Sequence, residues 1–238
     1  MRSNDEIIID ISYDRKIRFN ETIEIRDDNL VIEGNDHFMS EGSNTLFDVY
    51  GTGIVFKDMT FRSFDLEYGA LIYNESSLRF ENCRFLSNSF DDEYGIISNK
   101  GHLEIVNCLF EDNNLFLGKG SCIINHGTAL IKDSKFISNK SEYGGAIYNK
   151  SKLDISGSIF QGNTSEYEGG AIYNESRLKI LNSIFIENKS FKGGAICNED
   201  CLLIRDSSFE NNIASESNHI ENCKNAHADI LNTNFKDK

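Results

Sequence analysis

Acidic side chains recur along this chain in small groups that could bind a cation or cleave a polysaccharide. Two or three carboxylates on one surface can hold Ca²⁺, and a pair can act as acid and base on a glycosidic bond. The groups are Asp65 with Glu67, Asp91 to Glu93, Glu142, and Glu166 with Glu168. None follows a dense Ca²⁺-binding motif, so we interpret them as a solvated acidic edge. Ca²⁺ is the alternative, and we expect no other cofactor.

Three tyrosines, Tyr73, Tyr148 and Tyr173, each stand directly before an Asn at one position of an internal repeat. Parallel aromatic rings on adjacent coils could stack against sugars, so these tyrosines are our candidate ligand-contacting face. The alternative is an aromatic ladder that only stiffens a sheet.

The six Cys are not spaced as a zinc site, and the five His fall at unrelated positions of the repeat. Cys83 and Cys108 occupy equivalent inward positions, which favours free thiols in the core. Cys201 and Cys223 could form a disulfide in an oxidising compartment. We therefore predict no catalytic, cofactor-binding or metal-binding residue, and a protein that is not an enzyme.

The charge balance argues against one class of partner. Thirty-eight Asp and Glu against 24 Lys and Arg give a formal net charge of −14, which repels a phosphate backbone, so we expect no nucleic acid. No apolar stretch approaches the roughly 18 residues of a transmembrane helix. Met1 to Asp10 lacks the apolar core of a signal peptide.

An internal repeat of 24 to 26 residues must position these side chains. One Asn per repeat forms a series: Asn74, Asn99, Asn125, Asn149, Asn174, Asn198 and Asn222. A series of Phe runs in phase with it: Phe61, Phe85, Phe110, Phe136, Phe160, Phe185, Phe209 and Phe235. From Asn to the next Phe the count is 11 in six cases, whereas the segment from Phe to the next Asn varies from 13 to 15. The pattern predicts a rigid unit followed by a variable loop.

Three short alternating segments per repeat indicate strands. The residue three before each Phe is Asn, Asp or Gly, types that tolerate a positive φ, so we predict a sharp corner there. The third strand is the Gly-Gly-Ala-Ile-Tyr-Asn segment. Its period of two points Ile147 and Asn149 inward and leaves Ala146 and Tyr148 facing solvent. The repeat Asn should form a ladder of side-chain amides, coil on coil.

These features predict an all-β fold, a right-handed single-stranded parallel β-helix of about eight coils of 24 to 26 residues, with three short strands per coil. We assign Met1 to Asn44 to an N-terminal cap with irregular strands, and residues 45–238 to one continuous domain of repeats. In the strand that precedes the corner, Leu130 and Lys132 are assigned to inward positions, where Lys132 breaks the apolar pattern. The C-terminal coil edge should pair with further chain or with another copy.

Two short motifs alternate along the repeats. Gly-Gly-Ala-Ile occurs at 144–147, 169–172 and 193–196, and Phe-x-x-Asn ends at Asn88, Asn113, Asn139, Asn163, Asn188 and Asn212. This alternation resembles the repeats of polymorphic membrane proteins and related adhesin-like parallel β-helix proteins, over roughly residues 55–235. The resemblance implies an extracellular or cell-surface protein that acts in adhesion.

Three functions stay open. We favour a non-enzymatic, adhesin-like surface module that presents a β-helix face to a glycan or protein partner. The second is a pectate-lyase-like polysaccharide-active enzyme, because such enzymes share the predicted fold, although the outward positions of the third strand hold almost no ionisable side chain. The third is a purely structural or assembly segment of a larger surface protein.

Overall fold

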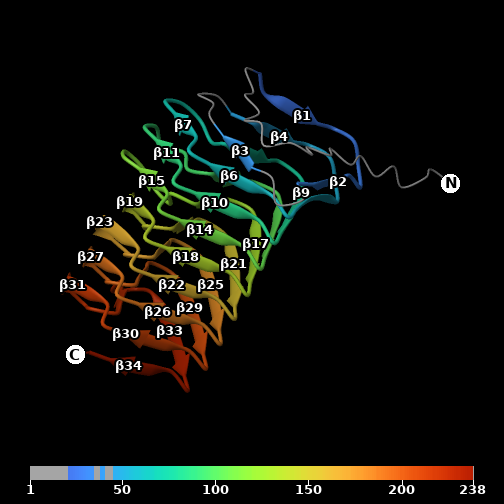
Figure 1. The fold of residues 1–238 in the computed structure, drawn as a ribbon. Helices are drawn as coiled ribbons and strands as arrows, with labels where there is room; N and C mark the ends of the chain where they lie inside the picture. Colours follow the sequence, from blue (N-terminus) through green and yellow to red (C-terminus); the bar gives the residue numbers. More distant parts are fainter. Residues whose placement is uncertain (1–20, 35–37, 41–44, 238) are drawn as a thin grey trace.

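The computed structural model describes residues 21–34, 38–40 and 45–237, and the regular structure of these residues is entirely β-strand. The chain winds coil on coil into a rod (Figure 1). Its strands form four parallel sheets, which we number I to IV in the order in which each coil visits them. The chain is therefore an all-β, right-handed parallel β-helix of about eight coils, as the repeat predicts. Among the described residues no helix is long and apolar enough to cross a membrane.

The first two sheets each contain nine strands in the described part of the chain. Sheet I consists of β1 (Ile23–Ile25), β4 (Phe47–Val49), β8 (Ile72–Asn74), β12 (Ile97–Asn99), β16 (Ile123–Asn125), β20 (Ile147–Asn149), β24 (Ile172–Asn174), β28 (Ile196–Asn198) and β32 (Ile220–Asn222). Sheet II consists of β2 (Val31–Glu33), β5 (Ile54–Lys57), β9 (Ser77–Glu81), β13 (His102–Val106), β17 (Thr128–Lys132), β21 (Lys152–Ser156), β25 (Arg177–Leu181), β29 (Cys201–Arg205) and β33 (His227–Leu231).

The other two sheets have nine and seven described strands. Sheet III consists of β3 (Phe38–Ser40), β6 (Thr60–Arg62), β10 (Arg84–Leu86), β14 (Leu109–Glu111), β18 (Lys135–Ile137), β22 (Ile159–Gln161), β26 (Ile184–Ile186), β30 (Ser208–Glu210) and β34 (Asn234–Lys236). Sheet IV consists of β7 (Asp65–Leu66), β11 (Ser89–Phe90), β15 (Asn114–Leu115), β19 (Lys140–Tyr143), β23 (Thr164–Glu168), β27 (Lys189–Lys192) and β31 (Ile213–Glu216).

Sheet IV is the main difference from the predicted coil, which had three strands. Its strands lie in the variable segment after each Phe, and the first three are only two residues long. Two residues are too few to show an alternating pattern.

In sheet II, Ala129 and Ile131 are the inward residues of β17, since they pair with Leu103 and Ile105. The assignment of Leu130 and Lys132 to inward positions was therefore wrong by one residue.

Stacked Phe rings fill the middle of the rod. From Phe61 to Phe209, the centroids of consecutive rings in sheet III lie 4.5–4.8 Å apart, with interplanar angles of 2–9°. Ile72 and its counterparts through Ile196 are completely buried beside them. Burying one such side chain contributes about 1.5–3 kcal/mol, and each coil must stack on its neighbours to achieve it.

Two ladders of Asn side chains, all buried except the terminal Asn222, run along the rod. In sheet I, each Nδ2 from Asn74 onward donates to Oδ1 of the next coil's Asn, ending at Asn222, with distances of 2.7–2.8 Å. A second ladder uses the Asn of Phe-x-x-Asn, from Asn88 to Asn212, with distances of 2.8–3.0 Å. Its Nδ2 groups also donate to the Phe carbonyl one coil back, such as Phe136 O from Asn163. These polar side chains satisfy one another inside the core.

Residues with positive φ form the corners of the coil. The predicted corner is confirmed, because all eight residues three before Phe have φ between 48° and 61°, among them Asn182 and Gly157. A second corner, two residues after Phe, was not predicted, and there Ser63 and Ser138 also have positive φ. The Gly pair forms a third. Gly144 has φ 58°, and a Cβ on Gly145 would lie 2.2 Å from the carbonyl oxygen of Gly170.

The described strands at the N-terminal end continue the sheets of the repeats. β1, β2 and β3 pair in parallel with β4, β5 and β6. The two described segments that we assigned to a cap of irregular strands, at residues 23–25 and 30–32, are therefore wound as part of a regular coil. The other strands predicted for the cap, Ile7 to Ile11 and Ile17 to Phe19, lie outside the described residues.

Candidate functional site

A groove with a cavity volume of about 410 Å³ lies on the outer face of sheet I. Ile124 of β16 and Tyr148 of β20 line it, together with His126 and Lys150, which follow the same two strands. Sheet IV and the segments that lead from it back to sheet I complete the lining. From these segments come Glu93, Tyr94, Leu117, Gly118 and Lys119, and Glu142 comes from β19.

Tyr148 is the most constrained side chain of the groove. It is only 2% exposed, and its ring stacks on that of Tyr173 at a centroid distance of 5.4 Å. Lys119 Nζ lies 4.6 Å from the ring centroid and donates a 3.0 Å hydrogen bond to the hydroxyl, which itself donates to Glu175. Burial, followed by this contact with Glu175, raises the pKa of Tyr148. The phenol therefore stays protonated and cannot serve as a base at neutral pH.

The imidazole of His126 in the groove is shifted toward its neutral form. Burial lowers its pKa, and the positive charges of Lys150 and Lys100 lower it further. A neutral imidazole can donate one hydrogen bond and accept another. With the ammonium groups of Lys119 and Lys150 and the carboxylates of Glu93 and Glu142, the groove offers donors and acceptors beside aromatic rings.

The three tyrosines of the predicted face do not form one exposed strip. Tyr148 and Tyr173 stack, but Tyr73 is separated from them by Ser98 and Ile124 in the column of register partners. Tyr73 instead contacts Tyr94 edge-on at 5.7 Å and accepts a hydrogen bond from the Ala70 amide. Tyr73 and Tyr173 are partly exposed, whereas Tyr148 is covered.

The expectation that Ala146 and Tyr148 face solvent was wrong for both residues. Ala146 is fully buried in the core, because the chain bends before β20: the amides of Ala146 and Ile147 both donate to the carbonyl of Ala171. The alternation of inward and outward side chains therefore starts at Ile147, one residue later than expected. Tyr148 does point out of sheet I, but Lys119 and the neighbouring Tyr173 cover it.

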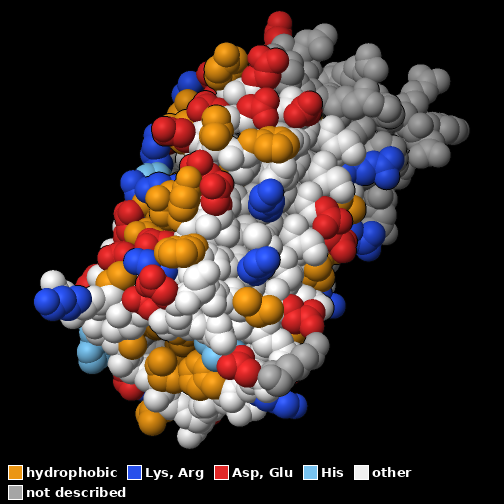
Figure 2. Space-filling model, turned by 90° about the vertical axis from the view of Figure 1, so that its left-hand side faces the viewer, with side chains coloured by type: hydrophobic (Ala, Val, Ile, Leu, Met, Phe, Trp, Pro, Cys, Tyr) orange, Lys and Arg blue, Asp and Glu red, His pale blue; other side chains and the backbone are white. Residues whose placement is uncertain are grey.

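The acidic groups of the variable segment lie along an edge of mixed charge. On the side of sheet IV, acidic and basic side chains are interspersed (Figure 2). Lys192 Nζ, for example, lies 3.8 Å from Glu168 Oε1 and 3.7 Å from Glu216 Oε2. Among the residues that the structure describes, the only group of three that could hold a metal ion is Cys197, Glu199 and Cys223. The absence of a Ca²⁺ site stays a prediction.

All six Cys are free thiols. Cys83 and Cys108 are buried and continue a ladder in which Ser134, Ser158 and their counterparts accept hydrogen bonds from the preceding coil's amide. Cys83 N donates to Cys108 Sγ in the same way, at 3.4 Å. Cys201 pairs in register with His227, and Cys223 lies instead beside Cys197.

The groove was not predicted, because its residues come from segments of different type. Lys119 lies in a variable return segment, and its contact Tyr148 lies 29 residues away on the next coil. One signal was present: the return segment after Phe110 is the longest, with 15 residues from Phe110 to Asn125. A long loop beside a regular sheet can form one side of a groove.

Comparisons with known proteins concern the fold more than the groove. The Chlamydia polymorphic membrane protein repeat matches residues 157–175, which include the Gly-Gly-Ala-Ile at 169–172. No curated protein matches the sequence. Among solved structures, the chain is similar to a mutant of the PL6 family alginate lyase AlyGC, with 14% identity and a TM-score of 0.56. The match covers 99% of this chain and 36% of that one, so the chain spans about a third of that structure.

The alginate lyase likeness, at this identity, shows the fold alone. The sequence profile described as right handed beta helix region matches residues 13–160. Since this match covers more than half of the chain's residues, the chain belongs to the right-handed β-helix family.

Proposed function

We propose that this chain is a non-enzymatic, adhesin-like module of the cell surface, which binds a glycan in the groove over β16 and β20. The observation that carries the proposal is the convergence of the partly exposed Tyr94 with the ammonium groups of Lys119 and Lys150 in one groove, over the buried ring of Tyr148. Its volume of about 410 Å³ lies within the range of small-ligand sites. Aromatic rings stack on the apolar faces of sugars, and charged groups hydrogen-bond their hydroxyls.

The groove is already organised before a ligand arrives. Hydrogen bonds to Lys119 and Glu175 and the stacked ring of Tyr173 hold Tyr148 in place. Side chains that are fixed in advance lose little entropy on binding, which favours affinity. The match to the Chlamydia polymorphic membrane protein repeat supports placement at a cell surface.

A glycan array probed with the purified chain, followed by titration of the best ligand, tests the proposal. We expect Lys119→Ala and Tyr94→Ala each to weaken binding by about tenfold or more, because each removes a direct contact. Tyr68→Ala is the matched control, since Tyr68 is 74% exposed and lies outside the groove lining. Undiminished glycan binding by both groove variants would place the ligand elsewhere.

A polysaccharide-active enzyme is the second candidate, favoured by the alginate lyase fold likeness and by the presence of both His126 and Lys119 in the lining of the groove. A neutral His could remove a proton while a Lys neutralises a sugar carboxylate. The raised pKa of Tyr148 argues against that residue as the base. Incubation with alginate and pectin separates the two candidates. Release of shortened, ultraviolet-absorbing products that disappears in His126→Ala would establish the enzyme.

The third candidate, an assembly segment, concerns the C-terminal end of the rod. Ile213, Leu231 and Phe235 are 58%, 53% and 44% exposed there, and an apolar group is visible at the lower end of Figure 2. We propose that this edge pairs with further chain or with another copy, since strand edges add strands readily. Light scattering over a range of protein concentrations would detect association, and Phe235→Asp should reduce it.

A further inference from the structure

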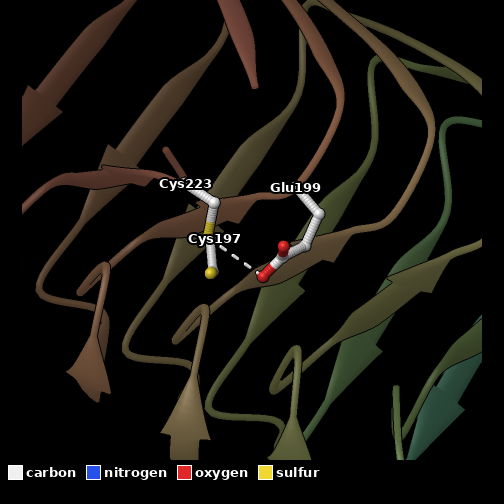
Figure 3. A group of neighbouring side chains, drawn as sticks. All are labelled: Cys197, Glu199 and Cys223. Carbon is white, nitrogen blue, oxygen red and sulfur yellow. Dashed lines mark hydrogen bonds between the residues drawn. The ribbon is translucent and has the colours of Figure 1, made fainter. Parts of the chain in front are cut away.

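Two thiols and a carboxylate meet on the outer face of sheet I, near the C-terminal end of the rod (Figure 3). Cys197 is the central residue of β28, and Glu199, two residues after Cys197 and directly after the strand, lies on the same side. Asn198 pairs with Asn222, so Cys223 stands one coil beyond Glu199 at the equivalent position. The stacking of coils thus brings together residues that are 26 positions apart in the sequence.

The separations between the donor atoms suit a tetrahedral metal ion. One ligand atom from each of the three residues lies within 4.8 Å of the others, and Cys223 Sγ lies 3.0 Å from Glu199 Oε1. Around tetrahedral zinc, with Zn–S near 2.3 Å and Zn–O near 2.1 Å, two sulfurs lie about 3.8 Å apart, and a sulfur and an oxygen about 3.6 Å. The observed distance between Cys223 Sγ and Glu199 Oε1 is shorter than the second value, and small side-chain rotations would bring the three atoms to one centre.

Neighbouring side chains supply what a metal site needs beyond three ligands. Glu168 Oε2 lies 3.9 Å from Cys197 Sγ and adds a further carboxylate beside the cluster. The hydroxyl of Tyr173 donates a 3.2 Å hydrogen bond to Glu199 Oε1, which orients that carboxylate. Such outer contacts are typical of metal centres, where they fix the ligating group.

The cluster is also partly shielded from solvent. Cys197 is fully buried, so its thiol is shielded from bulk water. A divalent ion would compensate the negative charge of two thiolates and a carboxylate, and its binding would release about two protons.

We propose that Cys197, Glu199 and Cys223 bind a thiophilic divalent cation of the Zn²⁺ class, which ties the last coil to the one before it. Thiolates select zinc-like ions over Ca²⁺, which prefers oxygen ligands. β32 is the last described strand of sheet I, so a metal bridge between Cys223 and β28 would secure that end. The site is separate from the glycan groove and goes beyond the proposed function.

The test uses the reduced full chain, freed of metal by a chelator that is then removed. Titration with Zn²⁺, and with Co²⁺ as a spectroscopic probe, should show one ion per chain and a thiolate-to-cobalt absorption band. We expect Cys223→Ser to weaken Zn²⁺ binding by about 100-fold or more and Glu199→Gln by about tenfold. Zn²⁺ should raise the melting temperature of the wild type but not that of Cys223→Ser. Cys201→Ser is the matched control and should bind as the wild type does.

Cys223 is partly exposed and Glu199 exposed, so their variants should keep the fold, which circular dichroism would verify. Zn²⁺ affinity unchanged in Cys223→Ser, or no Zn²⁺ bound by wild type with all six thiols titratable, would overturn the proposal. So would a Cys197–Cys223 disulfide, seen as four titratable thiols in place of six, together with failure to bind Zn²⁺ after reduction. Because the groove residues are untouched, glycan binding is measured independently of these outcomes.

Discussion

The side-chain amide of Asn149 donates a 2.7 Å hydrogen bond to Oδ1 of Asn174, its counterpart one coil further along the rod. Asn149 Oδ1 in turn accepts from Asn125 Nδ2 at 2.8 Å. Both Asn149 and Asn174 are fully buried. Each such side chain therefore hydrogen-bonds to the Asn of both neighbouring coils, and its removal leaves an amide group without this partner on each of them.

Asn149→Ala should lower the free energy of unfolding by about 2–4 kcal/mol, because buried amide groups on two coils lose a partner. Urea unfolding followed by circular dichroism measures the change. Lys152→Ala, in the same coil but exposed, should change it by less than about 0.5 kcal/mol. Equal losses in the two variants would show that the ladder contributes nothing specific.

Phe136→Ala should lower the free energy of unfolding by about 3–5 kcal/mol, since it opens a cavity in the middle of the ring stack. Phe136→Leu should cost less, because Leu keeps most of the volume. Phe191, which is 49% exposed, is the control, and its change to Ala should cost under about 1 kcal/mol. The same unfolding experiment decides among them, and a Phe191→Ala loss as large as that of Phe136→Ala would contradict this assignment.

Two glycines should respond differently to substitution because they are needed for different reasons. Gly145→Ala should destabilise the chain by more than about 2 kcal/mol, since its Cβ would lie 2.2 Å from a backbone oxygen. Gly162 has φ 64°, but the nearest atom to an added Cβ is 3.6 Å away. Gly162→Asn should be tolerated, as Asn211 has φ 52° at the equivalent corner. Thermal unfolding of both variants tests this contrast, which fails if Gly162→Asn is the worse of the two.

Asp48→Asn should stabilise the chain at neutral pH. Burial, followed by the charges of Glu24 and Glu75, raises the pKa of Asp48 above its ordinary value of 3.8. The folded chain therefore holds this proton more tightly than the unfolded chain. The resulting penalty is absent below pH 3.8, grows as the pH rises through the raised pKa, and is complete above it.

The measurement for Asp48 is urea unfolding of the wild type and of Asp48→Asn at about pH 7 and about pH 3. A gain in the free energy of unfolding is expected at the higher pH, with little difference at the lower one. The opposite order, with the gain confined to low pH, would contradict the raised pKa. Asp58→Asn, a change at a corner residue with φ 52°, serves as the control for the loss of one negative charge.

The repeat made most of the fold predictable. Identical residues such as Phe136 and Phe160 recur in phase, and in-register stacking follows from that recurrence. Sheet IV escaped prediction because its first strands, such as Asp65–Leu66, are too short to show a period. The second corner was not predicted because Ser63 and Ser138 have a positive φ although Ser is not a residue type that indicates one.

The sites were less predictable than the fold, because they depend on contacts between coils. Cys197 and Cys223 show no metal-site spacing along the chain, and only the coil period places Cys223 beyond Glu199. The groove depends on the path of the loop that carries Lys119, and the alternation of polar and apolar residues does not predict the path of a loop. Tyr148 was correctly placed on the outer side of its strand, but its cover comes from that loop.

Both Asn ladders point the same way. In every bond between two ladder Asn side chains, Nδ2 donates to Oδ1 of the next coil toward the C-terminus, from Asn74 to Asn222 and from Asn88 to Asn212. The side-chain dipoles therefore add along the axis, and each bond polarises the next. The rod is electrically directional, with the positive end of its amide columns at the C-terminal coil and the negative end at the N-terminal coil.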